Sequence, residues 1–384
     1  MHLSRLFARK SAPPVAQSET ADERTYVASQ WQLMWWKFRR HRLAMVSTVI
    51  VIGLYLVALF VEPLAAYDPE LQDTRLAYRP PTTIHFIDAD GKFHLRPFVY
   101  GVKQKRDLET LALVYTDDVS KIYPIHFWVQ GTPYKLWGLI PMNRHLFGVK
   151  DPEGRVLLFG ADAQGRDVYS RLIYGTRISM SVGLLGVIIS FVLGIIIGGI
   201  SGFYGGTVDT IVQRVIEFLR SMPTVPLWMS LSAALPANWP PLRIYFGITI
   251  ILSLIGWTGL ARVVRGRFLA LREEDFVMAA KISGSSEMRI ILRHMVPSFL
   301  SHIIAALTLA VPDMILSETA LSFLGLGLRY PAISWGVLLQ DAQNIRAVAS
   351  APWLLTPGLA VVLAVLTLNF MGDGLRDAAD PYTR

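Results

Sequence analysis

Long apolar runs separated by short polar segments dominate the chain. Leu43–Val61, Ile178–Ile200 and Ile244–Leu260 contain no charged side chain, and Phe299–Leu316 and Ala351–Met371 are nearly as apolar. At a rise of about 1.5 Å per residue, about 20 such residues cross a hydrocarbon core of about 30 Å. Buried helices of soluble proteins rarely stay uncharged for so long, so these runs predict transmembrane helices.

A sixth span is predicted at roughly Asp209–Leu235, where the pattern is less regular. Charged residues stand near its start and prolines interrupt it; they are Arg214, Glu217, Arg220, Pro223 and Pro226. Prolines free backbone carbonyls inside a membrane, and such sites often kink and line cavities. Met222, Pro223 and Pro226 are therefore candidates for a pathway. The fold class predicted is an all-α polytopic membrane protein with six transmembrane helices.

Charge sets the expected orientation. Basic residues cluster before the first span and between the fourth and fifth spans, and the positive-inside rule places both segments in the cytoplasm. An even number of spans leaves both termini there. The predicted organisation is a cytoplasmic segment (1–42), a first helix (43–61), an external loop (62–177), a transmembrane core (178–371) and a cytoplasmic tail (372–384).

Composition agrees with a membrane protein and excludes several functions. Hydrophobic residues make up 52% of the chain and charged residues 17%, against about 25% in soluble proteins. The net charge of +8 follows from the topology, and no feature indicates nucleic-acid binding. There is no cysteine for a disulfide or a thiolate metal site. No G-x-x-x-x-G-K-[ST], G-x-S-x-G or H-E-x-x-H pattern occurs, so no catalytic, cofactor or metal site is expected.

The polar loop between the fourth and fifth spans (262–297) contains two short helical patterns. Acidic residues at 273–275 suit a helix N-terminus. One narrow face of small and apolar groups follows at helical spacing, formed by Phe276, Ala279, Ala280 and Ser283. Gly284 can take the left-handed conformation that ends a helix, and Ser285 or Ser286 can cap the next one. By pattern alone, an ordinary amphipathic surface loop explains the segment equally well.

This loop resembles the cytoplasmic EAA loop of ABC-importer permeases, which docks into the ATPase subunit. Ala279, Ala280, Gly284 and Pro297 stand in register with the family pattern, whereas Met278 replaces the usual Glu and His294 a usual aliphatic residue. The residues expected to couple to the ATPase are Phe276, Ala279, Ala280, Ser283, Gly284 and Glu287. The replacement at Met278 argues against one specific salt bridge but not against docking.

Other segments resemble one subfamily, the permeases of dipeptide, oligopeptide and nickel importers. These segments are Gly160–Gly183, Ser317–Gly327, Ser334–Gly336 and Asn369–Pro381. The resemblance implies the type I ABC importer permease fold and a non-catalytic subunit of the inner membrane. It implies a second homologous permease, two cytoplasmic ATPase subunits carrying ATP and Mg, and an external solute-binding protein as partners. Peptides or peptide-like solutes would be the cargo.

Two intramembrane features have both structural and functional interpretations. One edge of the second span has no side chains, because glycines recur there every four residues at Gly194, Gly198 and Gly202. This edge favours close packing within the bundle over a contact with a partner permease. Asp313 is a carboxylate within a span and so a candidate for contact with substrate or gate. It is also predicted near the outer end of its span, where it would simply reach water.

The external loop contains an insertion, at about 82–144, that departs from the family. It alternates apolar and polar residues, with hairpin turns predicted at Asp90–Gly91 and at Gln130–Pro133. We expect a small β-rich cap. Its core would be aromatic, formed by Phe93, Phe98, Tyr100, Trp128 and Trp137. A functional alternative is that the cap touches the binding protein or fences the entrance.

Two other classes of protein remain open at this stage. An autonomous ion-coupled secondary transporter would be expected to have inverted repeats and ionisable groups at the midplane. Only Asp313 supports this class. A membrane-anchored enzyme would carry its active site in the external loop, whose carboxylates and histidines show no catalytic spacing.

Overall fold

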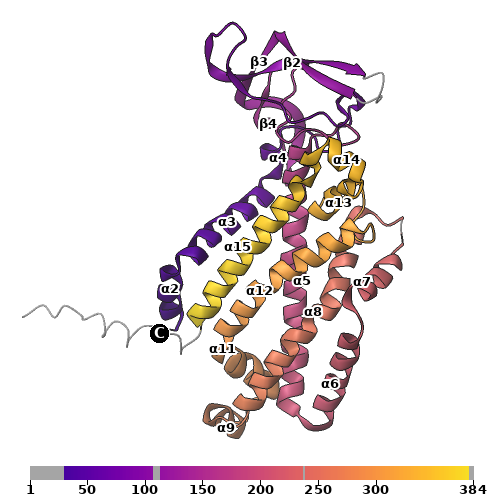
Figure 1. Cartoon of the computed structure of the whole chain (residues 1–384). Helices are drawn as coiled ribbons and strands as arrows, with labels where there is room; N and C mark the ends of the chain where they lie inside the picture. Colours follow the sequence, from indigo (N-terminus) through magenta and orange to yellow (C-terminus); the bar gives the residue numbers. More distant parts are fainter. Residues whose placement is uncertain (1–29, 107–112, 237, 380–384) are drawn as a thin grey trace, which may run out of the picture.

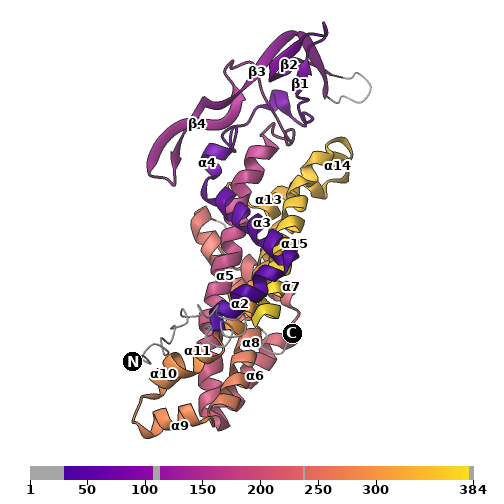
Figure 2. The same ribbon diagram turned by 90° about the vertical axis from the view of Figure 1, so that its left-hand side faces the viewer.

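The computed structural model describes residues 30–106, 113–236 and 238–379. The molecule is elongated, with a β-sheet at one end and helices α9 to α11 at the other (Figure 1). The first basic residues of the predicted N-terminal segment and residues 380–384 of the predicted tail lie outside the described residues. Helix α2 and the end of α15 lie toward the end that carries α9 (Figure 2).

The long helices form one bundle, and short helices connect them. In chain order the helices are α2 (Gln30–Arg40), α3 (Arg42–Leu59), α4 (Val61–Leu64), α5 (Val168–Tyr204), α6 (Gly206–Ser221), α7 (Thr224–Ala233), α8 (Pro241–Leu271), α9 (Asp275–Ile282), α10 (Glu287–Ile290), α11 (Val296–Ser298), α12 (Leu300–Phe323), α13 (Trp335–Gln340), α14 (Ile345–Ser350) and α15 (Thr356–Ala379). The strands are β1 (His85–Ile87), β2 (Phe93–Arg106), β3 (Leu113–Leu136) and β4 (Ile140–Val149).

Five helices among the described residues are long and apolar enough to cross a membrane: Arg42–Leu59, Val168–Tyr204, Pro241–Leu271, Ile303–Phe323 and Pro352–Ala379. The less regular span predicted at Asp209–Leu235 is not one long helix in the structure. Its residues form α6 and α7, and the break is at Met222, whose backbone is extended (φ −83°, ψ 139°). Pro223 follows, and the residue before a proline is pushed out of the helical region.

Glycines allow α5 and α8 to pack backbone against backbone. A Cβ atom at Gly202 would lie 2.7 Å from the carbonyl oxygen of Arg265, and one at Gly198 would overlap the backbone of Ala261. A Cβ at Gly194 would collide with the side chain of Leu260. The glycine stripe therefore packs within this chain, as the structural interpretation predicted. In the bundle α12 packs against α5 and α15, and α15 against α3.

The sheet is antiparallel, with strand order β1-β2-β3-β4. The Asp90–Gly91 turn is confirmed, since Asp88 and Lys92 close it and Gly91 has φ +81°. The turn predicted at Gln130–Pro133 is wrong. Strand β3 continues through it as an irregularity in its pairing with β4, and the chain reverses at Gly138 instead. Because that irregularity absorbs extra residues without ending the strand, the period of two could not locate the turn.

The core of the cap differs from the predicted aromatic cluster. Phe98 and Tyr100 are buried as expected, whereas Phe93, Trp128 and Trp137 are 64%, 49% and 46% exposed. The core instead includes Val99, Tyr123, Ile125, Phe147 and Val156, with Tyr169 of α5 packed against it. A single small sheet can bury only the face that rests on the bundle. The sheet also extends to Val149, beyond the predicted end of the insertion at 144.

Hydrogen bonds fasten α4 and the segment after it to α5 and to the sheet. The Ser170 hydroxyl at the start of α5 accepts from the backbone N–H groups of Ala66 (3.1 Å) and Tyr67 (3.0 Å). His145 of β4 contacts the carbonyl oxygen of Ala65 at 2.7 Å through Nδ1. Arg177 of α5 binds Glu62 of α4 through both terminal nitrogens, at 2.7 and 2.8 Å. The segment that leads into the cap is thus held to α5 by hydrogen bonds, and His145 connects the sheet to it.

Candidate coupling site and membrane face

Helix α9 ends in a Schellman motif, as the glycine predicted. Gly284 has φ +73°. Its N–H donates to Lys281 O at 3.0 Å, and the N–H of Ser285 donates to Ala280 O at 3.1 Å. These two bonds satisfy carbonyls that the helix end would otherwise leave unpaired. Ser286 occupies the N-cap of α10, but its side chain makes no capping hydrogen bond.

The face of α9 that was predicted to dock is partly exposed and partly packed against the bundle. Phe276 is 41% exposed, and Ala279 and Ser283 are exposed too. Ala280 is half-buried, in a cluster that contains Val277 and Phe268. The free surface also includes Ile282, 85% exposed, and Met278, 45% exposed. Helix α9 lies at the end of the molecule opposite the cap (Figure 1), and small and apolar side chains thus remain uncovered there.

The loop rests on the end of α5. The ammonium group of Lys281 lies 5.1 Å from the centre of the Phe203 ring. The Tyr204 hydroxyl, on the last residue of α5, donates a short hydrogen bond to the carboxylate of Glu287. Because α5 has 37 residues and reaches the cap, the loop contacts an element that runs the length of the bundle. Glu287, predicted as a coupling residue, therefore has an internal partner.

The pathway candidates fall in two places. Met222 and Pro223 form the junction between α6 and α7, and Pro226 lies in the first turn of α7. A proline in a first turn removes no helical hydrogen bond, because its N–H would have no intrahelical partner there. The expected kink at Pro226 is therefore wrong, and the break belongs to Met222 and Pro223. Both prolines are exposed, and Met222 is half-buried.

Asp313 lies midway along α12 rather than near its outer end, which corrects the sequence-based placement. The helix continues to Phe323, ten residues further on, or about 15 Å at the usual helical rise. The side chain is exposed on the surface of this chain while its neighbours Pro312 and Met314 are buried. The mid-helix position corrects only the predicted place of Asp313, and its contact with substrate or gate stays a prediction.

A buried carboxylate that sequence reasoning missed lies five residues beyond Asp313. Glu318 of α12 is fully buried and accepts hydrogen bonds from Ser322 and Ser334, each at 2.8 Å. Ser179 of α5 lies 3.5 Å from its second oxygen and accepts from the backbone N–H of Trp335 at 3.0 Å. Three of the segments that resemble the permease subfamily meet at this group. Their resemblance to the family indicated that these segments matter, but only the fold shows that they meet.

A second buried polar cluster stands at the cap end, before α5. Asp162 accepts from Arg166 at 2.7 Å and pairs with Arg171, and both arginines face Asp341 after α13. Asp167 caps α5 by accepting from the N–H of Ser170 at 2.8 Å. Burial raises the pKa of Asp167 to about 6, although hydrogen bonds from Ser170 and Tyr169 act in the opposite direction and lower that pKa. The signature at Gly160–Gly183 is thus the ion-pair and capping framework that fixes the start of α5.

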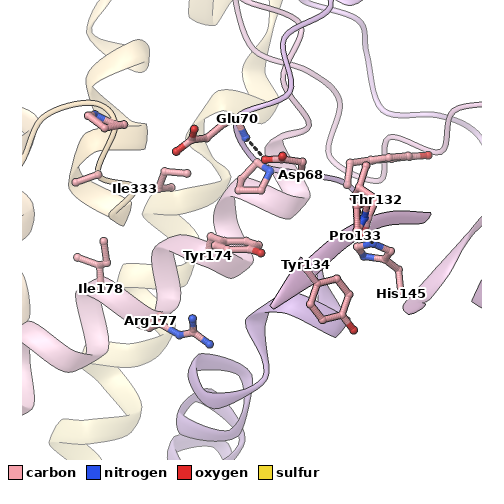
Figure 3. A pocket seen from close by; sticks show the side chains of 14 residues that line it. Asp68, Glu70, Thr132, Pro133, Tyr134, His145, Tyr174, Arg177, Ile178 and Ile333 are labelled. Carbon is pink, nitrogen blue, oxygen red and sulfur yellow. Dashed lines mark hydrogen bonds between the residues drawn. The ribbon is translucent and has the colours of Figure 1, made fainter. Parts of the chain in front are cut away.

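A hollow of about 330 Å³ lies between the cap and the bundle (Figure 3). Tyr134 and His145 of the sheet and Tyr174 and Arg177 of α5 line it, with Asp68 and Glu70 from the intervening loop. The wall also contains Pro331, Ala332 and Ile333, which precede α13. The hollow has charged and aromatic walls. It is a candidate contact surface for an external ligand or protein.

These features define a polytopic membrane protein: a helical bundle with an uncovered loop at one end and a capping sheet at the other. Residues 191–384 match the family described as "Binding-protein-dependent transport system inner membrane component", and residues 29–81 match the "N-terminal TM domain of oligopeptide transport permease C". The chain belongs to this family of binding-protein-dependent permeases and has the type I ABC importer permease fold. It is a transport subunit and not an enzyme.

Curated relatives agree over the same region. The chain is 39% identical over 228 residues to the dipeptide transport system permease protein DppC of Bacillus subtilis, covering 59% of this chain and 69% of the relative. It is 43% identical over 227 residues to the oligopeptide transport system permease protein OppC of Haemophilus influenzae, covering 59% and 70%. Membership of a binding-protein-dependent family rules out the autonomous ion-coupled transporter that the sequence alone left open.

Among solved structures, the chain resembles one from the MetNI methionine ABC transporter in an inward-facing conformation. The match is 18% identical, covers 55% of this chain and 96% of the other, and has a TM-score of 0.43. The family assignment rests on the sequence relationships, to which this likeness adds nothing.

Proposed function

We propose that this chain forms, with a second homologous permease, the translocation pathway for peptides or peptide-like solutes. An external solute-binding protein delivers the cargo, and two cytoplasmic ATPase subunits, which carry ATP and Mg, drive the transport. The peptide assignment is supported by the names of the relatives, which are dipeptide and oligopeptide permeases. No cofactor or metal is assigned to this chain.

The observation that carries the proposal is the uncovered face of α9. Phe276, Ala279 and Ser283 present two small side chains and one aromatic ring outside the bundle. Small residues let a groove of another protein close around the helix, and Gly284 fixes the bend after it. The side of α9 that contains Val277 and Ala280 packs inward, so motion of a bound ATPase would reach the bundle through that contact.

The orientation follows from charge. The loop that contains α9 carries many of the basic residues, so the positive-inside rule places α9 in the cytoplasm and the cap outside. Helix α2 and the end of α15, which lie toward the α9 end, would then be cytoplasmic as well, as in an inner-membrane protein with both termini inside. The hollow beneath the cap would face the binding protein.

The pathway residues we propose are Met222, Pro223 and Pro226 at the α6–α7 junction, and Asp313 on α12. Each lies at least partly on surface that this chain does not cover itself. A pathway formed by two permeases would use such surfaces. A carboxylate midway along a helix is costly in lipid and acceptable in an aqueous passage.

Co-purification from native membranes, followed by mass spectrometry and an ATPase assay, tests the proposal. We expect recovery of a second permease and ATPase subunits, with assembly lost in Ala279→Glu. Met278→Glu is the matched control, because it adds the same charge at the exposed neighbouring position where the family has Glu. Ala280→Glu is less informative, since it would also disturb internal packing. Recovery of a single chain that transports without ATP would refute the proposal.

A further inference from the structure

The turn between β3 and β4 exposes a cluster of large apolar side chains. Trp137, Leu139 and Ile140 are 46%, 79% and 49% exposed, around a reversal at Gly138. Most exposed apolar residues occur singly and need no explanation. Three such residues at one hairpin tip make a patch that water solvates poorly, and such patches mark contact surfaces.

The level of this tip is set by its contact with the first membrane helix. The indole N–H of Trp137 donates to the carbonyl oxygen of Leu59 at 2.8 Å. Its ring lies 5.8 Å from the ring of Phe60. Leu59 is the last residue of α3, an 18-residue apolar helix that is little buried within the chain. The tip therefore lies where that helix leaves the hydrocarbon layer, beside α4 (Figure 2).

An apolar hollow continues the surface of α3 onto the cap. It has a volume of about 340 Å³ and is lined by Leu56, Val57, Phe60, Pro63, Leu64 and Trp128. Leu56 is 51% exposed on the membrane helix and Trp128 is 49% exposed on the sheet. The hydrophobic surface of the span and that of the cap are thus continuous. A hydrocarbon chain would fit this hollow better than a polar ligand.

The charge of the hairpin favours an anionic surface. From Val119 to Lys150 the sequence contains no Asp or Glu, but it contains Lys121, Lys135, Arg144 and Lys150. Lys135 and Arg144 flank the tip and are exposed. Basic residues close to an anionic bilayer are attracted to its headgroups, and tryptophans are enriched at membrane–water interfaces.

We propose that the β3–β4 hairpin lies in the headgroup region of the leaflet on the cap side and is anchored there by Trp137, Leu139 and Ile140. A lipid acyl chain occupies the hollow between α3 and Trp128, and Lys135 and Arg144 bind anionic headgroups. The cap is then held by the bilayer as well as by the bundle. This inference does not depend on the cargo or on the ATPase contact.

Site-directed spin labelling tests the proposal directly, because the natural chain has no cysteine. Leu139→Cys and Leu95→Cys are labelled separately in the full chain, reconstituted in nanodiscs containing phosphatidylglycerol. Leu95 is 89% exposed on β2 and is the matched control. Accessibility to oxygen, which concentrates in lipid, is compared with accessibility to a water-soluble nickel chelate.

We expect the label at 139 to be several-fold more accessible to oxygen relative to the chelate than the label at 95. Lys135→Glu combined with Arg144→Glu should lower that ratio at 139 and leave it unchanged at 95. Equal ratios at the two positions would overturn the proposal in favour of an aqueous hairpin. Low accessibility to both reagents at 139 would overturn it in favour of a protein partner.

Discussion

The hydroxyl of Ser334 donates a 2.8 Å hydrogen bond to the carboxylate of Glu318, joining the start of α13 to a fully buried acid in α12. The same oxygen accepts from Ser322, and Ser179 of α5 approaches the other. A buried acid is retained only when hydrogen bonds satisfy it. Glu318 is therefore the polar centre that holds three helices in register near the cap end of the bundle.

Replacement of Glu318 should destabilise the bundle. Glu318→Ala leaves buried serine hydroxyls without an acceptor and opens a cavity, for which we expect a loss of about 2–4 kcal/mol. Glu318→Gln keeps an acceptor oxygen and should lose less. Thermal unfolding in detergent, followed by size-exclusion chromatography, measures both. Asp313→Asn, an exposed site on the same helix, is the control, and an equal effect at both positions would contradict the assignment.

Asp313→Asn should reduce uptake without reducing assembly. The side chain is exposed on this chain and lies mid-helix, so its removal costs little stability but changes the charge of the proposed pathway. Uptake into vesicles is compared with the yield of the purified complex. Normal uptake by the variant would remove Asp313 from the pathway.

Gly284 should tolerate Asn better than Ala. A Cβ atom at this position meets nothing within 4 Å, so the cost of substitution comes from the left-handed backbone alone. That cost is about 1 kcal/mol for Ala and smaller for Asn, which visits this conformation more readily. Stimulated ATPase activity of the assembled importer should fall in the order Gly, Asn, Ala. Gly284→Arg should lose more than Ala only if the docked ATPase fills the space beside the bend.

Asp167 should make stability depend on pH. Its folded pKa of about 6 lies above the ordinary value of 3.8, so the folded state holds the proton more tightly. The contribution of Asp167 to the free energy of unfolding is fully present below pH 3.8, falls as pH rises, and is lost above pH 6. The free energy of unfolding changes by at most about 3 kcal/mol over this range. Unfolding temperatures across this range, compared with those of Asp167→Asn, isolate the contribution. Parallel curves for the two proteins would contradict it.

Removal of the cap should impair stimulation by the binding protein while leaving the bundle intact. The backbone N–H of Thr82 donates to Leu157 O at 2.8 Å, so the two ends of the insertion lie side by side. A short glycine–serine linker in place of residues 84–154 preserves this crossing, whereas a cut at 144 would divide β4. Basal and stimulated ATPase activity are measured on the same preparation. Unchanged stimulation of ATPase activity by the binding protein would show that the cap has no role in that stimulation.

Local sequence patterns were enough to predict the membrane class, five of the long helices, the Gly284 bend and the first hairpin. Each follows from local rules: an apolar run long enough to cross lipid, a residue able to take positive φ, and an Asp-Gly turn. The resemblance to a known family predicted the importer class, because several segments of this chain match the family's patterns in the same order.

The other features depend on packing between elements that are distant in the sequence. Ala280 turns inward although it shares a helical face with Ala279, because α8 and the segment after α10 cover that side. Strand β3 passes through Gln130–Pro133, because pairing with β4 continues around an irregularity. The three serines around Glu318 are up to 155 residues apart, between Ser179 and Ser334 (334 minus 179). Local periodicity holds no information on such distances, and only packing brings those groups together.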